Sequence, residues 1–255
     1  MIDIILAAGY ATRMYPLTEN FPKPLLEVGG VTLLDRLLAD LDAIEAIERH
    51  VIVSNHKFIA CFEAWLQTAR YTKPVCLIDD GSVDNDHRIG AVNDLLLALR
   101  TLEEQGIEPG DVMVLAADNV LDFSFEGYVR AFRERRTSMI MCYEEPSLQV
   151  LQRCGVVCLD DDGRVVLMEE KPREPKSHWV VPPFYIYARE DLPLVKTSVS
   201  RGCGYDAPGN LVHWLCTQRP IHAFPMPGRR FDIGNLETYE KMKNERVPLG
   251  GRGVL

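Results

Sequence analysis

A segment near the N-terminus combines small, cationic and rigid residues in a pattern suited to holding phosphate groups. It runs from Leu6 to Leu26, opening as Leu-Ala-Ala-Gly-Tyr-Ala-Thr-Arg and closing as Pro-Lys-Pro-Leu-Leu. Small residues let the backbone approach an anion closely, while Arg13 and Lys23 add two cations. The prolines stiffen the segment, which lowers the entropy lost when it closes around a ligand. An ordinary surface turn with two solvated bases is the alternative explanation.

Three later segments carry charged residues of the kind that bind metals, phosphates or hydroxyl groups. They are Ala117-Asp118-Asn119, Glu169-Glu170-Lys171-Pro172 and Phe231-Asp232-Ile233-Gly234. Each has a simple explanation by itself, because a strand-end aspartate often caps a turn and a Glu-Lys pair beside proline is usually solvated. Asp232 follows two arginines and could form a plain ion pair. A functional interpretation depends on their joint order along the chain.

The first half of the chain alternates short apolar runs with helical patterns. We expect strands over Ile2–Ala7, Val51–Ser54, Val75–Ile78 and Val112–Ala117, and helices over Val31–Ile44, Phe58–Leu66, Ala91–Leu102 and Phe125–Arg135. Such alternation predicts a Rossmann-like α/β fold with a parallel sheet. Ligands bind beyond the carboxyl ends of the strands in these sheets. Two loops leave such ends, Ala8–Pro24 after the first strand and Asp118–Asn119 after the fourth.

The second half has a different pattern. A hairpin is expected over Val156–Leu159 and Val165–Met168, followed by a strand over Val180–Tyr187 and helices over Gly209–Cys216 and Leu236–Lys243. No change in composition marks a linker. We therefore predict one domain over 1–255, with a nucleotide-binding part at about 1–120 and an acceptor-binding part at about 121–245.

The composition excludes several classes of protein. The 255 residues carry a formal net charge of −9, which disfavours broad binding to nucleic acid or to an anionic membrane. No apolar run approaches the roughly 20 residues that span a bilayer, and the N-terminus lacks the basic region of a signal peptide. The 7 cysteines include no CxxC pair, so reduced, structural cysteines are expected. These features favour a cytoplasmic protein.

Taken together, the four segments resemble the signature of the sugar-1-phosphate nucleotidyltransferases. Members of that family carry L-A-G-G-x-G-T-R-L-x-P-L-T…P-K-P-L, then G-D-N, E-K-P and W-x-D-x-G, and the chain is most similar to the short bacterial glucose-1-phosphate thymidylyltransferases and uridylyltransferases. The resemblance implies a Rossmann-like three-layer sandwich with a mostly parallel mixed sheet and a small β-rich sugar-binding subregion. It also implies an NDP-sugar pyrophosphorylase, which joins a nucleoside triphosphate (dTTP, UTP or CTP) to a sugar 1-phosphate and releases pyrophosphate.

The resemblance assigns roles to the charged residues. Asp118 and Asp232 would hold Mg²⁺, which needs few protein oxygens because it keeps waters and phosphate oxygens as ligands. Arg13 would lie along the β- and γ-phosphates. Lys23 would sit between the α-phosphate and the attacking sugar phosphate. Arg13, Lys23 and Asp118 are thus the expected catalytic residues, and no protein nucleophile is needed.

The resemblance also supplies two sets of binding residues. The expected nucleotide-binding residues are Leu6, Ala8, Gly9, Tyr10, Ala11, Thr12, Arg13, Asn85, Gly90 and Asp118. The expected sugar-phosphate-binding residues are Lys23, Asn119, Gly155, Glu170, Lys171, Phe184 and Tyr185. Glu170 would accept hydrogen bonds from sugar hydroxyls, Lys171 would pair with the sugar phosphate, and the backbone of Gly155 would face the sugar.

The base-reading segment is open, because 79–91 lacks the glutamine usual in the family. Asn85 or Asp80 could read a pyrimidine edge and Arg88 could reach a phosphate, but an acidic solvated loop explains the segment equally well.

The chain departs from the family pattern in two places. Ala11 replaces the second glycine, so the backbone there must tolerate a methyl group. Pro182-Pro183-Phe184-Tyr185 replaces T-G-[IL]-Y, which leaves the identity of the acceptor open. The alternatives are a cytidylyltransferase for a non-sugar phosphomonoester such as phosphocholine, and a non-catalytic sugar-nucleotide-binding protein. Retention of Glu170-Lys171-Pro172 argues against the first, and retention of Lys23 with both aspartates argues against the second. The sequence also leaves homo-oligomer formation and the pathway open.

Overall fold

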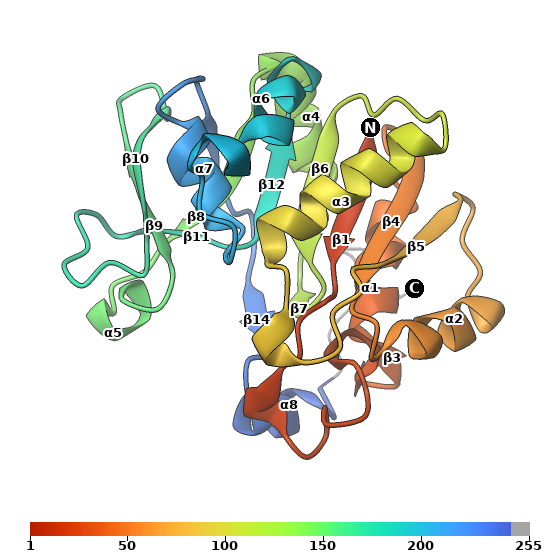
Figure 1. The fold of residues 1–255 in the computed structure, drawn as a ribbon. Coiled ribbons are helices and arrows are strands. Elements are labelled where there is room, and N and C mark those ends of the chain that lie inside the picture. The colour runs from red at the N-terminus through yellow and green to blue at the C-terminus, as the bar shows by residue number, and fades with distance from the viewer. Residues whose placement is uncertain (246–255) are drawn as a thin grey trace. The chain divides into compact units, whose positions relative to one another are not determined.

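The computed structural model describes residues 1–245 (Figure 1). The chain falls into two compact units. Within the described residues, the first, here called the N-terminal unit, comprises Ile2–Arg88, Ala116–Gly127 and 227–245. The second, the central unit, comprises Ile89–Leu115 and Tyr128–Met226. The last ten residues of the predicted domain, 246–255, lie outside the described part.

The core of the N-terminal unit is a parallel ladder of three strands. β1 (Ile2–Leu6) pairs with β4 (Arg49–Ser54), which pairs with β5 (Val75–Asp79), and α1 (Leu33–Leu41) and α2 (Ile59–Thr68) make the connections. β1 and β4 are rich in Ile and Val and almost wholly buried, as expected where both faces of a sheet are covered, whereas β5 is mostly half-buried. The predicted strand–helix alternation is confirmed here (Figure 1).

Helix α1 begins later than its apolar pattern indicates. Thr32 accepts a hydrogen bond from the backbone N–H of Asp35 at 2.9 Å and so caps the helix, which starts at Leu33. The two residues before, Val31–Thr32, form β3 against β2 (Glu27–Val28). The predicted helix over Val31–Ile44 is therefore correct in its centre but too long at both ends.

A second small ladder in the N-terminal unit joins distant parts of the sequence. β7 (Asn119–Leu121) runs antiparallel to β14 (Arg230–Asp232), and Asp232 lies opposite Asn119. Helix α8 (Leu236–Met242) follows and is held by a capping box between Asn235 and Thr238. Pairing of these short strands brings the chain around Asp118 next to the chain around Asp232.

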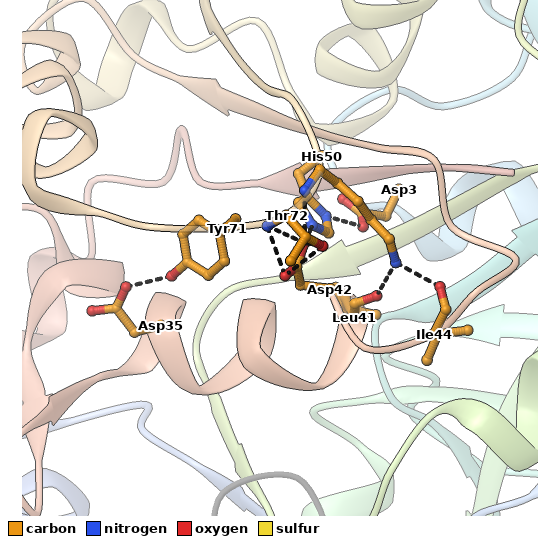
Figure 2. Close-up of polar contacts among 9 residues, drawn as sticks. Asp3, Asp35, Leu41, Asp42, Ile44, His50, Tyr71 and Thr72 are labelled. Atoms are coloured by element: carbon orange, nitrogen blue, oxygen red, sulfur yellow. Dashed lines mark hydrogen bonds and ion pairs between the residues drawn. The ribbon is translucent and has the colours of Figure 1, made fainter.

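A network of polar residues lies at the amino-terminal ends of the strands in the parallel ladder (Figure 2). His50 has no exposed surface and lies between two carboxylates. Its Nδ1 is 2.6 Å from Asp3 Oδ2, and its Nε2 is 3.3 Å from Asp42 Oδ1. Asp42 also accepts hydrogen bonds from Thr72. The ammonium group of Lys73 donates to carbonyls at the end of α1. The network ties β1, β4 and α1 to the turn before β5.

The central unit contains a mixed sheet. Its strand order is β10-β9-β11-β8-β12-β6, and β13 pairs in parallel with β8. The strands are β6 (Val112–Ala116), β8 (Met139–Glu144), β9 (Gly155–Leu159), β10 (Val165–Glu170), β11 (Trp179–Val181), β12 (Phe184–Tyr187) and β13 (His222–Pro225). The helices are α3 (Ala91–Glu104), most of α4 (Glu126–Arg135), α5 (Leu148–Leu151), α6 (Leu192–Thr197) and α7 (Gly209–Leu215). The predicted hairpin is confirmed as β9–β10.

The prediction of a single strand over Val180–Tyr187 is wrong. β11 ends at Val181 and pairs with β8 and β9, whereas β12 begins at Phe184 and pairs with β6 and β8. Pro182 and Pro183 lie between them. Proline has no N–H to give to a ladder, so two in succession end one strand and redirect the chain.

Within 1–245, no helix has the length and apolar character needed to cross a membrane. The 7 cysteines are all free thiols, in agreement with the expectation of reduced cysteines.

Candidate active site

The loop after β1 keeps a glycine-like backbone at its second turn. Ala11 adopts a left-handed conformation with φ 48° and ψ 42°. Its carbonyl accepts hydrogen bonds from the Thr18 hydroxyl at 2.8 Å and from the Met14 N–H at 2.9 Å. The sequence required a backbone conformation here that accepts a methyl group. The left-handed conformation does so, because it is unfavourable but allowed for alanine. The buried Thr18 holds it in place.

Exposed residues alternate with buried ones in the same loop. Ala8 and Tyr10 are buried, Leu6 and Ala11 are partly buried, and Gly9, Thr12 and Arg13 are exposed. The buried ones are anchored to neighbouring strand ends, because the Ala8 carbonyl accepts from Asn55 Nδ2 at 2.9 Å and the Tyr10 hydroxyl lies 3.1 Å from Ser82 Oγ. Asn55 and Ser82 were missed in the sequence, since a lone Asn or Ser carries no pattern.

Lys23 and Asp118 form the central ion pair of the N-terminal unit. Lys23 opens a short 3₁₀ helix, η2 (Lys23–Leu25), with Pro22 before it and Pro24 after it. Only 8% of the lysine is exposed, and its Nζ donates to Asp118 Oδ2 at 2.9 Å. Ninety-five residues separate the two in sequence. The pair joins the Leu6–Leu26 segment to the aspartate that follows β6.

The other oxygen of Asp118 is held by its neighbour. Asn119 Nδ2 donates to Asp118 Oδ1 at 2.7 Å, and Arg230 Nη1 donates to Asn119 Oδ1 at 2.8 Å. Asn119 is buried, and both ends of its amide are hydrogen-bonded within the N-terminal unit. Arg230 was not expected from the sequence. The available signal was its place two residues before Asp232, where the family pattern has tryptophan.

Asp232 lies beside Asp118. The backbone N–H of Ile233 donates to the Asp118 carbonyl at 3.1 Å, and Asp232 faces Asn119 across the ladder. Burial and then the negative charge of Asp118 raise the pKa of Asp232. The pKa of Asp118 is instead lowered, because the charge and hydrogen bond of Lys23 outweigh the effect of burial. Two carboxylates therefore adjoin, and only one is neutralised by a lysine.

The pair suits a cation that requires few protein ligands. Among residues 1–245, no hydrogen-bond donor reaches the side chain of Asp232, and no group of three or more His, Cys, Asp or Glu side chains forms a metal cage. Adjacent carboxylates, one of them without a donor, fit Mg²⁺, which fills its remaining positions with waters and phosphate oxygens. They do not fit a metal that needs four protein ligands.

The predicted base-reading segment forms an acidic loop with one helical turn. Asp84 caps η3 (Asn85–His87) by accepting from two backbone N–H groups. The carbonyl of the partly buried Asn85 accepts from the exposed Arg88 at 2.9 Å. Exposed His56 lies 2.6 Å from Asp79 at the end of β5. The loop thus carries several polar groups at the carboxyl ends of the parallel strands.

Gly90 belongs to the central unit and has a packing reason to be glycine. Its φ is 93°, and a Cβ there would come within 2.6 Å of the Tyr205 carbonyl. The nucleotide-binding role expected for Gly90 is therefore not needed to explain its identity.

The acceptor candidates Gly155, Glu170 and Lys171 lie together in the central unit. Gly155 faces Glu170 across the β9–β10 hairpin, and a Cβ on Gly155 would overlap the end of Met168. A Cβ on Gly209, the first residue of α7, would come within 2.5 Å of Glu170 Oε2. The Glu170 carboxylate therefore lies between two glycines, of which Gly209 was missed in the sequence.

Glu170 is only weakly neutralised. Lys171 Nζ is 3.9 Å from Glu170 Oε1, and the exposed Lys171 has φ 50°. Burial raises the pKa of Glu170. The positive charge of Lys171 opposes this rise, and the negative charge of Asp206 adds to the rise. A carboxylate in this setting can accept hydrogen bonds from a ligand.

Phe184 and Tyr185 are not placed like the other acceptor candidates. Both are buried in β12, with 0% and 3% of their surfaces exposed, and they pair with Leu115 and Val114 of β6. Rings that are so nearly buried offer an acceptor almost no surface in this conformation. We assign both to packing and correct their expected sugar-phosphate contacts accordingly.

A family model described as "Nucleotidyl transferase" matches residues 2–246. The chain belongs to the nucleotidyl transferase family. The resemblance that the four sequence segments suggested is confirmed, and with it the assignment to an enzyme family.

Known proteins with similar sequences are named as nucleotidyltransferases that act on glucose 1-phosphate. The UTP–glucose-1-phosphate uridylyltransferase AglF of Haloferax volcanii is 27% identical over 250 residues, covering 94% of each chain. The glucose-1-phosphate adenylyltransferase of Fervidobacterium nodosum is 22% identical, and the match spans 97% of this chain but only 61% of that longer protein.

Solved structures show the same fold. A UDP-glucose pyrophosphorylase complexed with UDP-glucose superposes with a TM-score of 0.78 at 17% identity, over 95% of this chain and 97% of that one. A putative glucose-1-phosphate thymidylyltransferase from Bacillus anthracis gives 0.77 at 20% identity, over 98% of both chains. The predicted Rossmann-like α/β fold of this nucleotidyl transferase is thereby confirmed.

Proposed function

We propose that the protein joins a nucleoside triphosphate to a sugar 1-phosphate, forming an NDP-sugar and releasing pyrophosphate. Membership of the nucleotidyl transferase family supports this, as does similarity to a uridylyltransferase over nearly the full length of both chains. The observation that carries the proposal is the buried Lys23 bonded to Asp118, with Asp232 adjoining. This arrangement places one cation and two carboxylates where the phosphate-binding loop ends.

The chemistry proposed for these residues is positioning and charge neutralisation. Lys23 leaves Asp118 and binds the α-phosphate and the incoming sugar phosphate, two anions that otherwise repel each other. Exposed Arg13 binds the β- and γ-phosphates and stabilises the leaving pyrophosphate. A phosphate oxygen of the acceptor attacks the α-phosphorus in line as the bond to the bridging oxygen of pyrophosphate breaks. The electron pair leaves with pyrophosphate.

We propose Mg²⁺ as the cofactor, held by Asp118 and Asp232. Bound there, the ion would neutralise charge on the α-phosphate. The pairing of a carboxylate that lacks a donor with one already neutralised by lysine supports this choice. The chain's own contribution is to keep Asp118 ionised through Lys23 and Arg230, and to fix both aspartates through Asn119 and the β7–β14 ladder.

We assign the nucleotide contacts to the N-terminal unit and the acceptor contacts mainly to the central unit. In the N-terminal unit, the exposed Gly9, Thr12 and Arg13 are available to a triphosphate. In the central unit, the Glu170 carboxylate between two glycines supports a role as acceptor of sugar hydroxyl hydrogen bonds, and exposed Lys171 supports a phosphate contact. The nucleotide contacts and the acceptor contacts are thus argued separately, each from residues of one unit.

A substrate screen tests the proposal. The four ribonucleoside triphosphates and dTTP are each incubated with Mg²⁺ and a panel of sugar 1-phosphates, together with phosphocholine, and pyrophosphate release is followed. Release with at least one sugar 1-phosphate, and none without an acceptor, is expected. Release with phosphocholine alone would replace the sugar by a non-sugar acceptor. Binding of an NDP-sugar without any release would identify a non-catalytic binding protein.

A further inference from the structure

A chain of hydrogen bonds leads from an arginine on β14 to the proposed metal-binding aspartate. Arg230 Nη1 donates to Asn119 Oδ1 at 2.8 Å, and Asn119 Nδ2 donates to Asp118 Oδ1 at 2.7 Å. A guanidinium group donates only, so it must face the carbonyl oxygen of the amide. The NH₂ group of Asn119 is then directed at Asp118. Arg230, which only donates, and the Asp118 carboxylate, which only accepts, thus select the same orientation of the Asn119 amide.

The β7–β14 ladder fixes where Arg230 lies relative to Asn119. Arg230 and Asp232 are two residues apart on β14, so their side chains project to the same face of the strand. Asp232 lies directly opposite Asn119 on β7, and Arg230 lies further along, opposite Leu121. A single rigid strand therefore presents one proposed metal ligand and the residue that orients the other.

The two oxygens of Asp118 have separate donors, Asn119 on Oδ1 and Lys23 on Oδ2. Under the proposed function, Lys23 turns to the phosphates and releases Oδ2. Asn119 is then the remaining side-chain donor of these two, and a buried amide without a second partner could rotate. Arg230 prevents that rotation, because turning the amide would set two groups of donors against each other.

We propose that Arg230 is a positioning residue, which through Asn119 holds the Asp118 carboxylate in place when Lys23 engages the substrates. This inference rests on the proposed function. Where the family pattern has tryptophan, this chain has an arginine, so the device belongs to the chain itself. Outer-shell partners of a metal ligand typically contribute about 10- to 100-fold in metal affinity or activity.

The test compares Arg230→Gln with Arg229→Gln. Both remove one positive charge from neighbouring positions, but Arg229 is exposed and pairs with Asp122 at 2.8 Å. Binding of Mn²⁺ in the presence of a non-hydrolysable triphosphate is measured by electron paramagnetic resonance, which requires no turnover. We expect Arg230→Gln to weaken Mn²⁺ binding at least about 10-fold and Arg229→Gln to leave it unchanged. Arg230→Lys, which can still donate to Asn119, should recover most of the loss.

A double-mutant cycle with Asn119→Ala decides whether Arg230 acts through the amide. In the Asn119→Ala background, Arg230→Gln should cause no further loss of Mn²⁺ affinity. Multiplicative losses in the double variant, or equal losses in the two arginine variants, would overturn the inference. Failure of the proposed function gives a different result, since Mn²⁺ would bind normally in the wild type while no acceptor released pyrophosphate. Melting temperatures confirm that each variant is folded.

Discussion

The Nζ atom of Lys23 lies 2.9 Å from Oδ2 of Asp118, although the two residues are 95 positions apart. The lysine is buried, and its partner is the carboxylate that we assign to metal binding. In the structure, these two charges neutralise each other. Under the proposed function, this contact opens when the phosphates of the substrates bind to Lys23.

Lys23→Ala should reduce turnover by about 100-fold or more, because an oriented cation is lost where transition-state charge develops. The KM for the nucleoside triphosphate should change far less, since Arg13 and the loop backbone remain. Steady-state kinetics with the best substrate pair from the screen would measure both. Lys57→Ala, which removes an exposed lysine of the same unit, is the control. A Lys23→Ala variant with normal kcat would place the reaction centre elsewhere.

Ala11→Gly should raise the free energy of unfolding by up to about 1 kcal/mol, because glycine adopts the left-handed conformation at φ 48° without the steric cost that alanine has. The same exchange at Ala98, buried inside α3, should lower it by about 1 kcal/mol or more. Urea denaturation would give both values. Destabilisation of similar size at the two positions would show that the conformation of Ala11 carries no strain.

Gly209→Ala should raise the KM for the acceptor by about 10-fold (about 1.4 kcal/mol) while leaving the KM for the nucleotide unchanged. The new methyl group would lie 2.5 Å from Glu170 Oε2 and 2.8 Å from Met168 Cε, so the carboxylate must move. Gly110→Ala is a matched control in the same unit, because nothing lies within 4 Å of the position that its new methyl group would take. Equal effects on the two substrates would remove Glu170 from the acceptor site.

His50→Asn should destabilise the protein most at low to neutral pH. Burial lowers the pKa of His50, but the hydrogen bonds and charges of Asp3 and Asp42 outweigh it and raise the pKa above 6.5 (Figure 2). The imidazolium therefore stabilises the fold fully below pH 6.5, and this contribution is lost as the pH rises through the raised pKa. At pH 6, leaving the fully buried carboxylate of Asp3 without its histidine partner should cost about 3 kcal/mol.

The measurement for His50 is urea denaturation of wild type and variant between pH 5.5 and 9. The difference between them should shrink as the pH rises. His56→Asn is the control, because His56 pairs with Asp79 at the surface, where ion pairs contribute less than about 1 kcal/mol. A difference for His50→Asn that does not change with pH would mean that the buried histidine is neutral.

The sequence predicts the elements that follow strong hydrophobic periodicity. β1, β4, β5, α2 and α3 were expected within a few residues of their bounds, since continuous apolar runs and leucine spacing report burial directly. Their alternation was enough for the fold class. The break at Pro182-Pro183 was overlooked because both flanking runs are apolar, although the prolines themselves carried the signal.

Strands that depend on a distant partner were not predictable. β7 and β14 have only three residues each, and pairing across more than 100 positions stabilises them. The order of motifs did predict that Lys23, Asp118 and Asp232 would belong to one site, but not that lysine and aspartate would bond. Arg230 and Gly209 were missed for the same reason, since their roles exist only through residues that the fold brings beside them.

The proposed reaction transfers a nucleotidyl group to a phosphorylated acceptor. Phosphorus-31 NMR of a reaction containing the triphosphate, the sugar 1-phosphate and Mg²⁺ follows every phosphorus atom at once. We expect the NDP-sugar and pyrophosphate to appear in equal amounts with the wild type, and neither to appear with Asp118→Ala although that variant folds. Formation of a nucleoside diphosphate with inorganic phosphate, or unchanged product formation by Asp118→Ala, would contradict it.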